Sequence, residues 1–323
     1  MPQLPFIVHI ILIIAGSITL VQAVKAFINS SSKIAKKIGI SGYTISFLLV
    51  AVATSLPEVV VGITSALEGN SILSFGNAIG SNVALITLVV ALPVLFSGQP
   101  GISTRTIIHS KDAYYTLFFG ILPIALAVDG KLNRTDGIIL IILYLVYFII
   151  VWRRSHGVEK IIEQLGEINL WKQGILFLIS LLLLLASSEV IVQSAMSLSL
   201  GLGWKLAFIG LSITAIGTSL PEIAFTIGAA KGRFQQEILG DIVGSLVANS
   251  TLVLGLTSVI HPISLTNGSQ GYSLIVLFTL IMLIFLSFVR SREKIDKAEA
   301  VFLIVLYILF IAAEYYLQTN SIF

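Results

Sequence analysis

Two short stretches of this chain place a carboxylate, hydroxyls and a proline inside segments that are otherwise apolar. The first reads ATSLPEVVVGIT at residues 53–64, and the second reads GTSLPEIAFTIG at residues 217–228. Glu58 is the carboxylate of the first stretch and Glu222 that of the second. A carboxylate in the apolar middle of a membrane is costly and functional by default, and two of them repel unless a cation lies between them. The pair therefore indicates a cation-binding site.

The other polar groups of these stretches are also oxygen donors. Pro57 and Pro221 lack an N–H group and crowd the preceding turn, so each should bend or break its helix and free a backbone carbonyl. Carbonyl, hydroxyl and carboxylate oxygens without sulfur or histidine are the ligands of hard cations such as Ca²⁺ or Na⁺. A hydroxyl considered alone can instead bond back to its own helix. The hydroxyls concerned are those of Thr54, Ser55, Thr218 and Ser219.

A second pair of motifs supplies the facing wall of the expected site. GNAIGS occupies residues 76–81 and GDIVGS residues 240–245, and the two glycines of each motif are spaced so that helix backbones can approach closely. Asp241 differs from its counterpart, and it could be a ligand, a proton carrier or a partner that orients a neighbouring oxygen. The polar residues that share this face at helical spacing are Asn77 and Ser81 in the first copy and Asp241, Ser245 and Asn249 in the second.

The two pairs of motifs belong to an internal repeat. Glu222 follows Glu58 by 164 positions (222 minus 58), and the same offset relates the two glycine motifs. Two separate motifs in one ungapped register indicate a duplication. Five apolar spans fall in each copy, and because five is odd, the second copy enters the membrane from the opposite side, as in transporters built from inverted repeats. A duplicated membrane protein with a purely structural role is the alternative.

The composition agrees with elements that cross a membrane. Hydrophobic residues make up 56% of the chain and charged residues 11%, whereas a soluble domain has about 25% charged residues. Apolar runs of about 20 residues, long enough to span the hydrocarbon core, recur throughout. The absence of cysteine excludes disulfides and thiolate metal sites. The predicted spans are 6–28, 42–67, 72–97, 113–129, 136–152, 173–198, 206–230, 237–260, 272–289 and 299–318.

These patterns predict an all-α membrane protein of ten transmembrane helices, arranged as two inverted five-helix repeats with broken helices at the midplane. Residues 1–152 form the first repeat, with its motifs in a segment of about 42–97. Residues 153–172 form a cytoplasmic connector. Residues 173–323 form the second repeat, with its motifs in a segment of about 206–260.

Basic residues set the expected orientation. Fifteen of the 19 Lys and Arg residues fall in the odd-numbered connectors between spans. Since positive residues stay on the cytoplasmic side, the odd connectors should be cytoplasmic and both termini outside, in a multi-pass protein of the cell (plasma) membrane. The net charge of +3 follows from this distribution and gives no reason to expect nucleic acid as a partner.

The motif TSLPE, followed by a GNxxGS-type helix once per half, resembles the α-repeats of the calcium/cation antiporter superfamily, especially of prokaryotic sodium/calcium exchangers. The resemblance covers essentially the whole chain. It implies exchange of Ca²⁺ by alternating access, with four central sites shared by both repeats and with the first and sixth helices sliding across a core of eight. Carried over by position, Glu58 and Glu222 would be the acidic calcium ligands, with the backbone carbonyls of Thr54 and Thr218. Sodium ligands would come from Ala51, Ser55, Ser81, Ala215, Ser219 and Ser245.

Several positions depart from the family's pattern. Many members carry Asn where this chain has Leu85, archaeal-type exchangers can carry Asp where it has Asn249, and the usual motif has Asn where it has Asp241. Calcium binding by two glutamates survives these changes, but the identity and number of counter-ions do not follow. Protons are the alternative to Na⁺, because a buried carboxylate can bind one. By the repeat offset, Glu189 corresponds to Lys25; the two could pair, or Lys25 could reach the cytoplasmic surface while Glu189 caps or lines an entry path.

These observations predict a secondary antiporter that exchanges Ca²⁺ for Na⁺ or H⁺, with the ions as substrates and no cofactor. The same scaffold could instead move another divalent cation such as Mg²⁺ or Mn²⁺, or sense ions without moving them. The expected partners are Ca²⁺, the monovalent counter-ion and the lipid bilayer, and a monomer suffices for transport. An enzyme is not expected, because the histidines that could act as bases fall at span ends or in connectors. They are His9, His109, His156 and His261.

Overall fold

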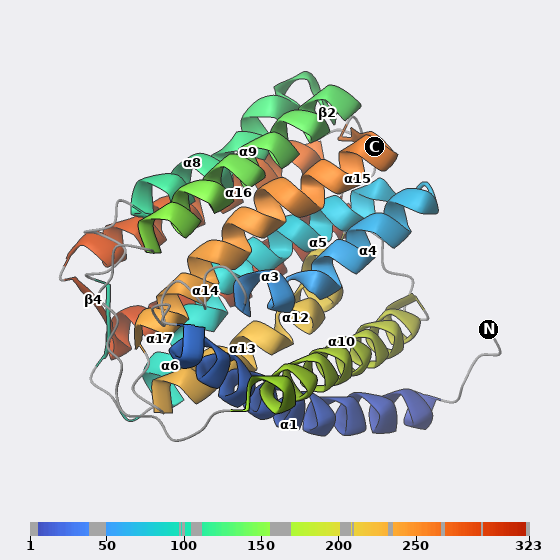
Figure 1. The fold of residues 1–323 in the computed structure, drawn as a ribbon. Helices are drawn as coiled ribbons and strands as arrows, with labels where there is room; N and C mark the ends of the chain where they lie inside the picture. The colour runs from blue at the N-terminus through green and yellow to red at the C-terminus, as the bar shows by residue number, and fades with distance from the viewer. Residues whose placement is uncertain are drawn as a thin grey trace.

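The computed structural model is a bundle of long helices and shorter, interrupted ones (Figure 1). Most of the described residues are helical, which confirms the predicted all-α class. The structure describes residues 6–38, 50–96, 98, 101–104, 112–155, 169–200, 208, 210–231, 235–265, 269–291 and 293–320.

The helical segments fall into two comparable series. The first series is α1 (Phe6–Ile38), α3 (Ala51–Thr54), α4 (Leu56–Leu67), α5 (Ser71–Ala84), η2 (Leu85–Val89), α6 (Val90–Phe96), α8 (Asp112–Leu126), η3 (Ala127–Asp129) and α9 (Arg134–Ser155). The second is α10 (Leu170–Leu200), η4 (Gly210–Thr214), α12 (Ala215–Thr218), α13 (Leu220–Lys231), α14 (Gln235–Val247), η5 (Ala248–Val253), α15 (Leu254–Ile260), α16 (Ser269–Ser291) and α17 (Lys297–Asn320).

Whole elements recur at the offset found in the sequence. Helices α3 and α12 begin at Ala51 and Ala215, which are 164 positions apart (215 minus 51), and α4 and α13 begin at Leu56 and Leu220 with the same spacing. The π-helical stretches η2 and η5 follow α5 and α14 at equivalent places. Such π-helical turns are rare and frequently occur at functional sites. The two halves therefore share their irregular features as well as their helices.

The helix breaks expected at the two prolines are present. The helix breaks at Ser55, between α3 and α4, and Pro57 occupies the second position of α4. Proline is tolerated there because the first N–H groups of a helix have no intrahelical acceptor. In the second half, the helices on either side of Ser219 are bent by 44°. The breaks leave Glu58 and Glu222 in the first turns of α4 and α13.

The motif-bearing helices form the centre of the bundle. In the spans Ser71–Phe96 and Ile238–Ile260, 78% and 83% of the apolar window is buried, whereas only 28% is buried in α9 and in α17. The outer helices instead expose large apolar side chains. This distribution is the one expected when outer helices face lipid and inner helices carry the polar groups.

The number of spans is only partly reproduced. Among the described residues, six helices are long and apolar enough to cross a membrane, or seven if the bent pair around Ser219 counts as one span. The predicted spans 6–28, 42–67 and 113–129 coincide with shorter apolar helices in α1, α4 and α8. Residues 39–49, which include the start of the second predicted span, lie outside the described residues. Ten spans therefore remain a prediction.

Within the described ranges, two short antiparallel strand pairs join the halves. Strand β1 (Gly101–Ser103) pairs with β4 (Lys294–Asp296), and β2 (Lys131–Leu132) pairs with β3 (Ile263–Ser264). Each pair takes one strand from each half. A Cβ atom on Gly101 would lie 2.6 Å from the carbonyl oxygen of Ile295, so glycine permits the close approach of β1 to β4.

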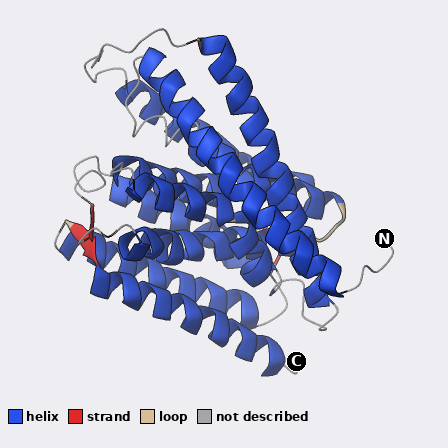
Figure 2. Ribbon diagram, turned by 90° about the horizontal axis from the view of Figure 1, so that it is seen from below, coloured by secondary structure: helices blue, strands red, loops and turns tan. Residues whose placement is uncertain are grey.

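Helices α1 and α10 form a pair at the edge of the bundle. They lie side by side in Figure 1, and Figure 2 shows them crossing obliquely over the other helices. Phe27 of α1 contacts Phe177 of α10, with ring centroids 4.8 Å apart. The helices begin 164 positions apart (170 minus 6), so this pair joins equivalent elements of the two halves.

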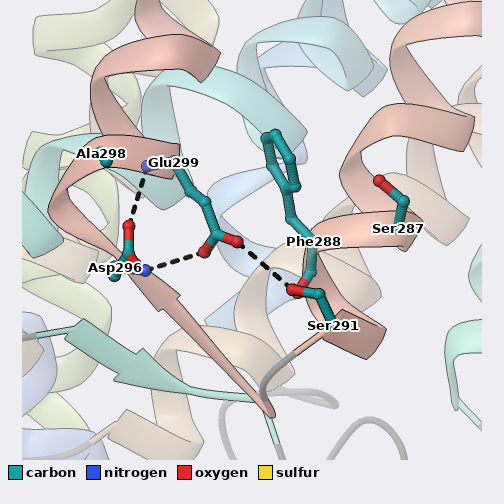
Figure 3. A pocket seen from close by; sticks show the side chains of 6 residues that line it. All are labelled: Ser287, Phe288, Ser291, Asp296, Ala298 and Glu299. Carbon is teal, nitrogen blue, oxygen red and sulfur yellow. Dashed lines mark hydrogen bonds between the residues drawn. The ribbon is translucent and has the colours of Figure 1, made fainter.

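The start of α17 is fixed by a capping box (Figure 3). The N–H of Glu299 donates to Asp296 Oδ1, and the N–H of Asp296 donates to Glu299 Oε2, both at 3.0 Å. Reciprocal bonds of this kind satisfy the free N–H groups at a helix N-terminus. These residues line a pocket together with Ser287, Phe288, Ser291 and Ala298, and none of the predicted site residues belongs to it.

Candidate cation site

Glu58 and Glu222 lie inside the bundle, where their side chains are 0% and 1% exposed. Each occupies the first turn of a helix, where the helix dipole favours a negative charge. Both carboxylate oxygens of Glu58 and Oε2 of Glu222 are buried with no hydrogen-bond partner among the described residues. A buried charge without a partner is strongly unfavourable. These oxygens therefore require a cation or a proton that the described side chains do not supply.

Glu58 is approached by side chains of both halves. The hydroxyls of Ser81 and Thr218 lie beside its carboxylate, outside hydrogen-bonding geometry, and are 3.2 Å from each other. The Ser81 hydroxyl also donates to the carbonyl oxygen of Ala215 at 3.4 Å. Because Thr218 and Ala215 belong to the second half, the surroundings of Glu58 are built from both repeats.

Glu222 has the mirrored surroundings. Thr54 from the first half and Ser245 from its own half lie beside it, and the Ser245 hydroxyl donates to Glu222 Oε1 at 3.5 Å. The Thr54 hydroxyl has three acceptors, Asp241 Oδ1 at 3.3 Å and the carbonyl oxygens of Val50 at 3.0 Å and Ala51 at 3.3 Å. A single hydroxyl proton serves these acceptors in turn. The sequence alone allowed such a hydroxyl to bond back to its own helix. Thr54 does so, and it also contacts Asp241 of the other repeat.

Asp241 and its counterpart Asn77 make the same contact, each with a threonine of the other half. Thr218 donates to Asn77 Oδ1 at 3.2 Å, and Thr54 donates to Asp241 Oδ1 at 3.3 Å. The remaining polar atoms, Asn77 Nδ2 and Asp241 Oδ2, are both buried and lack a hydrogen-bond partner among the described residues. The second half therefore replaces an amide by a carboxylate without changing the bond to the threonine.

The three carboxylates act on one another but do not form one ligand cluster. The charges of Glu58 and Asp241 both act on Glu222. Nevertheless, within the described parts of the chain, no group of three or more His, Cys, Asp or Glu residues is placed to hold a metal ion. An ion shared by Glu58 and Glu222 would therefore complete its shell with neutral oxygens. This geometry favours the orienting role for Asp241, and its ligand and proton-carrier roles remain predictions.

Further uncommitted polar atoms come from the helix breaks and from η5. The hydroxyls of Ser55 and Ser219 are buried, and neither has a hydrogen-bond partner among the described residues. The same holds for both amide atoms of Asn249, whose counterpart Leu85 is buried as well. Buried polar groups are normally paired, so a group of unpaired ones indicates a site for ions or water.

The carbonyls of Ala51 and Ala215, both predicted sodium ligands, already accept one backbone hydrogen bond each. The donors are the N–H groups of Ser55 and Ser219, both at 3.0 Å. Hydroxyls also donate to these oxygens, Thr54 to Ala51 at 3.3 Å and Ser81 and Thr218 to Ala215 at 3.4 Å, so a cation at either carbonyl would replace a hydroxyl proton.

The glycine motif permits the close approach that its spacing predicted. A Cβ atom on Gly80 would collide with the carbonyl oxygen of Leu211 and lie 2.8 Å from Ala215 Cβ. A Cβ atom on Gly210 would lie 2.6 Å from the carbonyl oxygen of Leu73. These contacts hold α5 of the first half against η4 and α12 of the second, and thereby bring the two sets of oxygens together.

A polar contact beside the site was missed at the level of sequence. Asn82 Nδ2 donates to Ser250 Oγ at 2.7 Å, which links α5 to η5, and both residues are fully buried. At the repeat offset the corresponding residues are Leu246 and Ile86, so the other half has an apolar pair there. The available signal was the amide that directly follows Ser81 in an apolar segment, because a buried amide needs a partner.

Glu189 does not enter the site. Its side chain is exposed on α10, where Oε1 accepts a hydrogen bond from Gln193 Nε2 at 2.8 Å. The side chain of Lys25, its counterpart, lies outside the described part of the structure. The proposed pairing of the two residues therefore remains a prediction.

The histidines are also separate from the site oxygens where the structure describes them. His261 Nδ1 is 3.1 Å from the Ser71 hydroxyl, and this serine belongs to neither TSLPE motif. His9 lies near the start of α1. His109 and His156 fall outside the described residues.

A known protein family matches the chain in two segments, one in each half. The model of a family described as sodium/calcium exchanger protein matches residues 8–153 and 172–316. The matched segments begin 164 positions apart (172 minus 8), which is the offset of the repeat. Together they cover most of the chain.

Individual relatives match the chain over nearly its full length. It is 26% identical over 351 residues to the sodium/calcium exchanger MaX1 of Methanosarcina acetivorans, covering 96% of this chain and 99% of that protein. It is 28% identical over 321 residues to the inner membrane protein YrbG of Escherichia coli, covering 95% and 97%. Among solved structures, the sodium-calcium exchanger NCX_Mj soaked with Na⁺ and Sr²⁺ matches with a TM-score of 0.79 and 26% identity, over 95% of this chain and 99% of that chain. The chain belongs to the sodium/calcium exchanger protein family.

Proposed function

We propose that this protein is a secondary antiporter that exchanges Ca²⁺ for Na⁺ across a membrane. The observation that carries the proposal is the pair Glu58 and Glu222, two buried carboxylates from different halves whose oxygens lack protein partners among the described residues. A divalent cation between them would offset their repulsion, and oxygen ligands suit Ca²⁺. Membership in the sodium/calcium exchanger family supports this choice of ions.

In the proposed calcium site, Glu58 and Glu222 provide the charge, and the backbone carbonyls of Thr54 and Thr218 complete the shell. Asn77 Oδ1 and Asp241 Oδ1 accept bonds from the threonine hydroxyls and so hold this part of the backbone in place. Na⁺ would use the neutral oxygens around the same carboxylates, including the Asn249 amide. The sodium ligands would come from Ala51, Ser55, Ser81, Ala215, Ser219 and Ser245.

Shared carboxylates provide a physical basis for exchange. If Ca²⁺ and Na⁺ need the same two charges, binding of one ion displaces the other. The site must also open to each side of the membrane in turn, and inverted repeats offer two related ways to open it. Helices α1 and α10 would move in this step, because they pair with each other at the edge of the bundle.

We further propose ten transmembrane helices in two inverted repeats, 1–152 and 173–323, joined by the cytoplasmic connector 153–172. The broken helices would meet at the midplane, and both termini would lie outside the plasma membrane. The recurrence of whole elements at one offset and the basic residues of the odd connectors support this arrangement. The partners would be the ions and the lipid bilayer, and one chain would suffice for transport.

Flux measurements on the purified protein in proteoliposomes test the proposal. Labelled Ca²⁺ is followed while the Na⁺ and H⁺ gradients are varied independently. We expect an outward Na⁺ gradient to drive Ca²⁺ uptake into the vesicles when the pH is equal on both sides. Uptake driven only by a pH gradient would replace Na⁺ by H⁺, and preferred uptake of Mg²⁺ or Mn²⁺ would change the substrate. Calcium binding without flux in any gradient would indicate a sensor.

A further inference from the structure

Helix α17 carries a buried carboxylate that the cation site does not use. Glu314 is 7% exposed and lies within the apolar window Lys297–Leu317. Its Oε1 atom is buried and has no hydrogen-bond partner among the described residues. An ionisable group of this kind inside a membrane span calls for a functional explanation.

The position of Glu314 on the helix directs it toward the protein interior. Helix α17 packs against α6, η2 and α16. Its buried residues follow helical spacing, as expected for one face in contact with a core. They are Ala300, Leu303, Tyr307, Phe310 and Glu314.

Among the described residues, the elements that pack against α17 provide no counter-charge near Glu314, and the neighbour of Tyr315, Phe208, is apolar. Neither α6 nor η2 contains a titratable residue. Helix α16 contains Tyr272 and Arg290, and Arg290 lies in its last turn, close to the start of α17. The charged residues of β4, Lys294 and Asp296, directly precede α17. Glu314 is about 25 Å further along the helix from Lys297, at a rise of about 1.5 Å per residue.

The equivalent helix of the first half has the same buried spacing without the carboxylate. Helix α9 buries Leu140, Tyr147 and Val151, and α17 buries Leu303, Phe310 and Glu314. The two sets are related by an offset of 163 positions (314 minus 151). Because an apolar residue fills this place in α9, packing of such a helix does not itself require an acid.

We infer that Glu314 is a proton-binding site, separate from the cation site, at the contact of α17 with the core. A lone carboxylate in apolar surroundings is stable only when it is paired or neutral. With no cationic side chain among its described neighbours, a proton is the ligand that neutralises it. The next residues, Tyr315 and Tyr316, are 45% and 66% exposed. Tyrosine is enriched where membrane meets water, so Glu314 lies near a source of protons.

The site also has a consequence for exchange, and this part rests on the proposed function. Helix α17 contacts η2, and η2 continues the helix that carries Ser81. Loss of the proton would place a charge in an apolar contact next to this helix. We expect that ionisation of Glu314 slows calcium exchange.

Infrared difference spectroscopy on the purified full-length protein tests proton binding without transport. As the pH is raised, the wild type should lose a carboxylic-acid band that Glu314→Gln lacks from the start. Glu314→Val, which copies Val151, should lack it too, while Glu189→Gln, which changes an exposed acid, should retain it. Identical spectra in wild type and Glu314→Gln would overturn the inference, as would loss of the band on adding Na⁺ or Ca²⁺ at constant pH. If Glu314→Gln does not fold, Glu314→Asp should still show the band at a shifted pH, and its absence would count against the site.

Flux in proteoliposomes tests the consequence. Glu314→Gln fixes the neutral form, so its calcium exchange should depend less on pH than that of the wild type. Equal pH dependence in the two proteins would overturn the link to exchange. The two proposals can fail separately: an acid band without any calcium exchange contradicts the antiporter, whereas normal exchange with unchanged spectra contradicts the proton site.

Discussion

Helices α3 to α6 and α12 to α15 pass through the same order of break, helix and π-helical turn, but they bring different side chains to the site. Each half contributes one TSLPE glutamate. The first half then adds Asn77 and Leu85, and the second adds Asp241 and Asn249 in their places. The threonine contact of Asn77 is retained by Asp241. The backbone frame is therefore common to both halves, while charge and polarity can change at single positions within it.

This difference concentrates charge in the second half. Glu222 experiences the charges of both Glu58 and Asp241. The polar link from Asn82 to Ser250 adds a second asymmetry, because its counterparts are apolar. Variants that remove these differences, or that make the two halves alike, show which differences affect ion binding.

The largest effect should come from the pair that both halves share. Glu58→Gln or Glu222→Gln removes one of the two charges that balance a divalent cation, so calcium transport should be abolished while the protein still folds. Transport is measured as labelled Ca²⁺ uptake, and folding as monodisperse elution in detergent. Glu68→Gln is the matched control, since this exposed carboxylate lies at the C-terminal end of α4, the helix that carries Glu58. Unchanged uptake in either glutamate variant would refute the site assignment.

A smaller effect is expected when the second half is made to resemble the first. Asp241→Asn keeps an oxygen for the Thr54 hydroxyl but removes a negative charge near the ion. We expect the apparent affinity for Ca²⁺ to fall about tenfold, which corresponds to ~1.4 kcal/mol. The reverse change, Asn77→Asp, should raise it. Equal affinities in Asp241→Asn and wild type would show that this charge does not reach the ion.

The polar link can be tested through stability. Asn82→Leu leaves the Ser250 hydroxyl buried without its donor, which should cost about 1–3 kcal/mol. Adding Ser250→Ile makes both positions apolar, as they are at the equivalent residues Leu246 and Ile86 of the other half. The double variant should therefore recover much of the lost stability. Thermal unfolding in detergent measures both. A double variant that loses the sum of the two single effects would argue against a direct pairing.

The smallest change in calcium binding should come from Leu85→Asn. This substitution places an amide at the position equivalent to Asn249, where the ion would be a monovalent one in our proposal. The dependence of flux on Na⁺ and H⁺ should therefore change more than the affinity for Ca²⁺. Asn249→Leu is the converse variant. If both leave the counter-ion dependence as in the wild type, these two positions do not choose the counter-ion.

The parts of the structure that follow from local chemistry were predictable. Proline within an apolar run predicted the breaks after α3 and α12, and each break leaves its glutamate in a first turn. The glycine spacing predicted the close approach seen at Gly80. The carboxylates could be paired because one offset relates both motifs. For the breaks and the close approach, the signal lies within a few residues of the feature, whereas the pairing of the carboxylates needed the repeat.

Features that depend on packing between distant segments were not predictable. The link from Asn82 to Ser250 joins residues 168 positions apart. Helix α17 has two acids in its sequence, and only the fold separates Glu299, which caps the helix, from Glu314, which faces the core. The π-helical turns also left no signal, because the residues of η2 resemble those of an ordinary apolar helix.

In the proposed exchange, one divalent cation binds between the carboxylates contributed by the two halves. An experimental structure of the protein with bound Ca²⁺, or with Sr²⁺ located by anomalous scattering, tests it most directly. We expect a single strong divalent peak coordinated by both Glu58 and Glu222. A peak bound to only one of them, or located elsewhere with both carboxylates unoccupied, would contradict it.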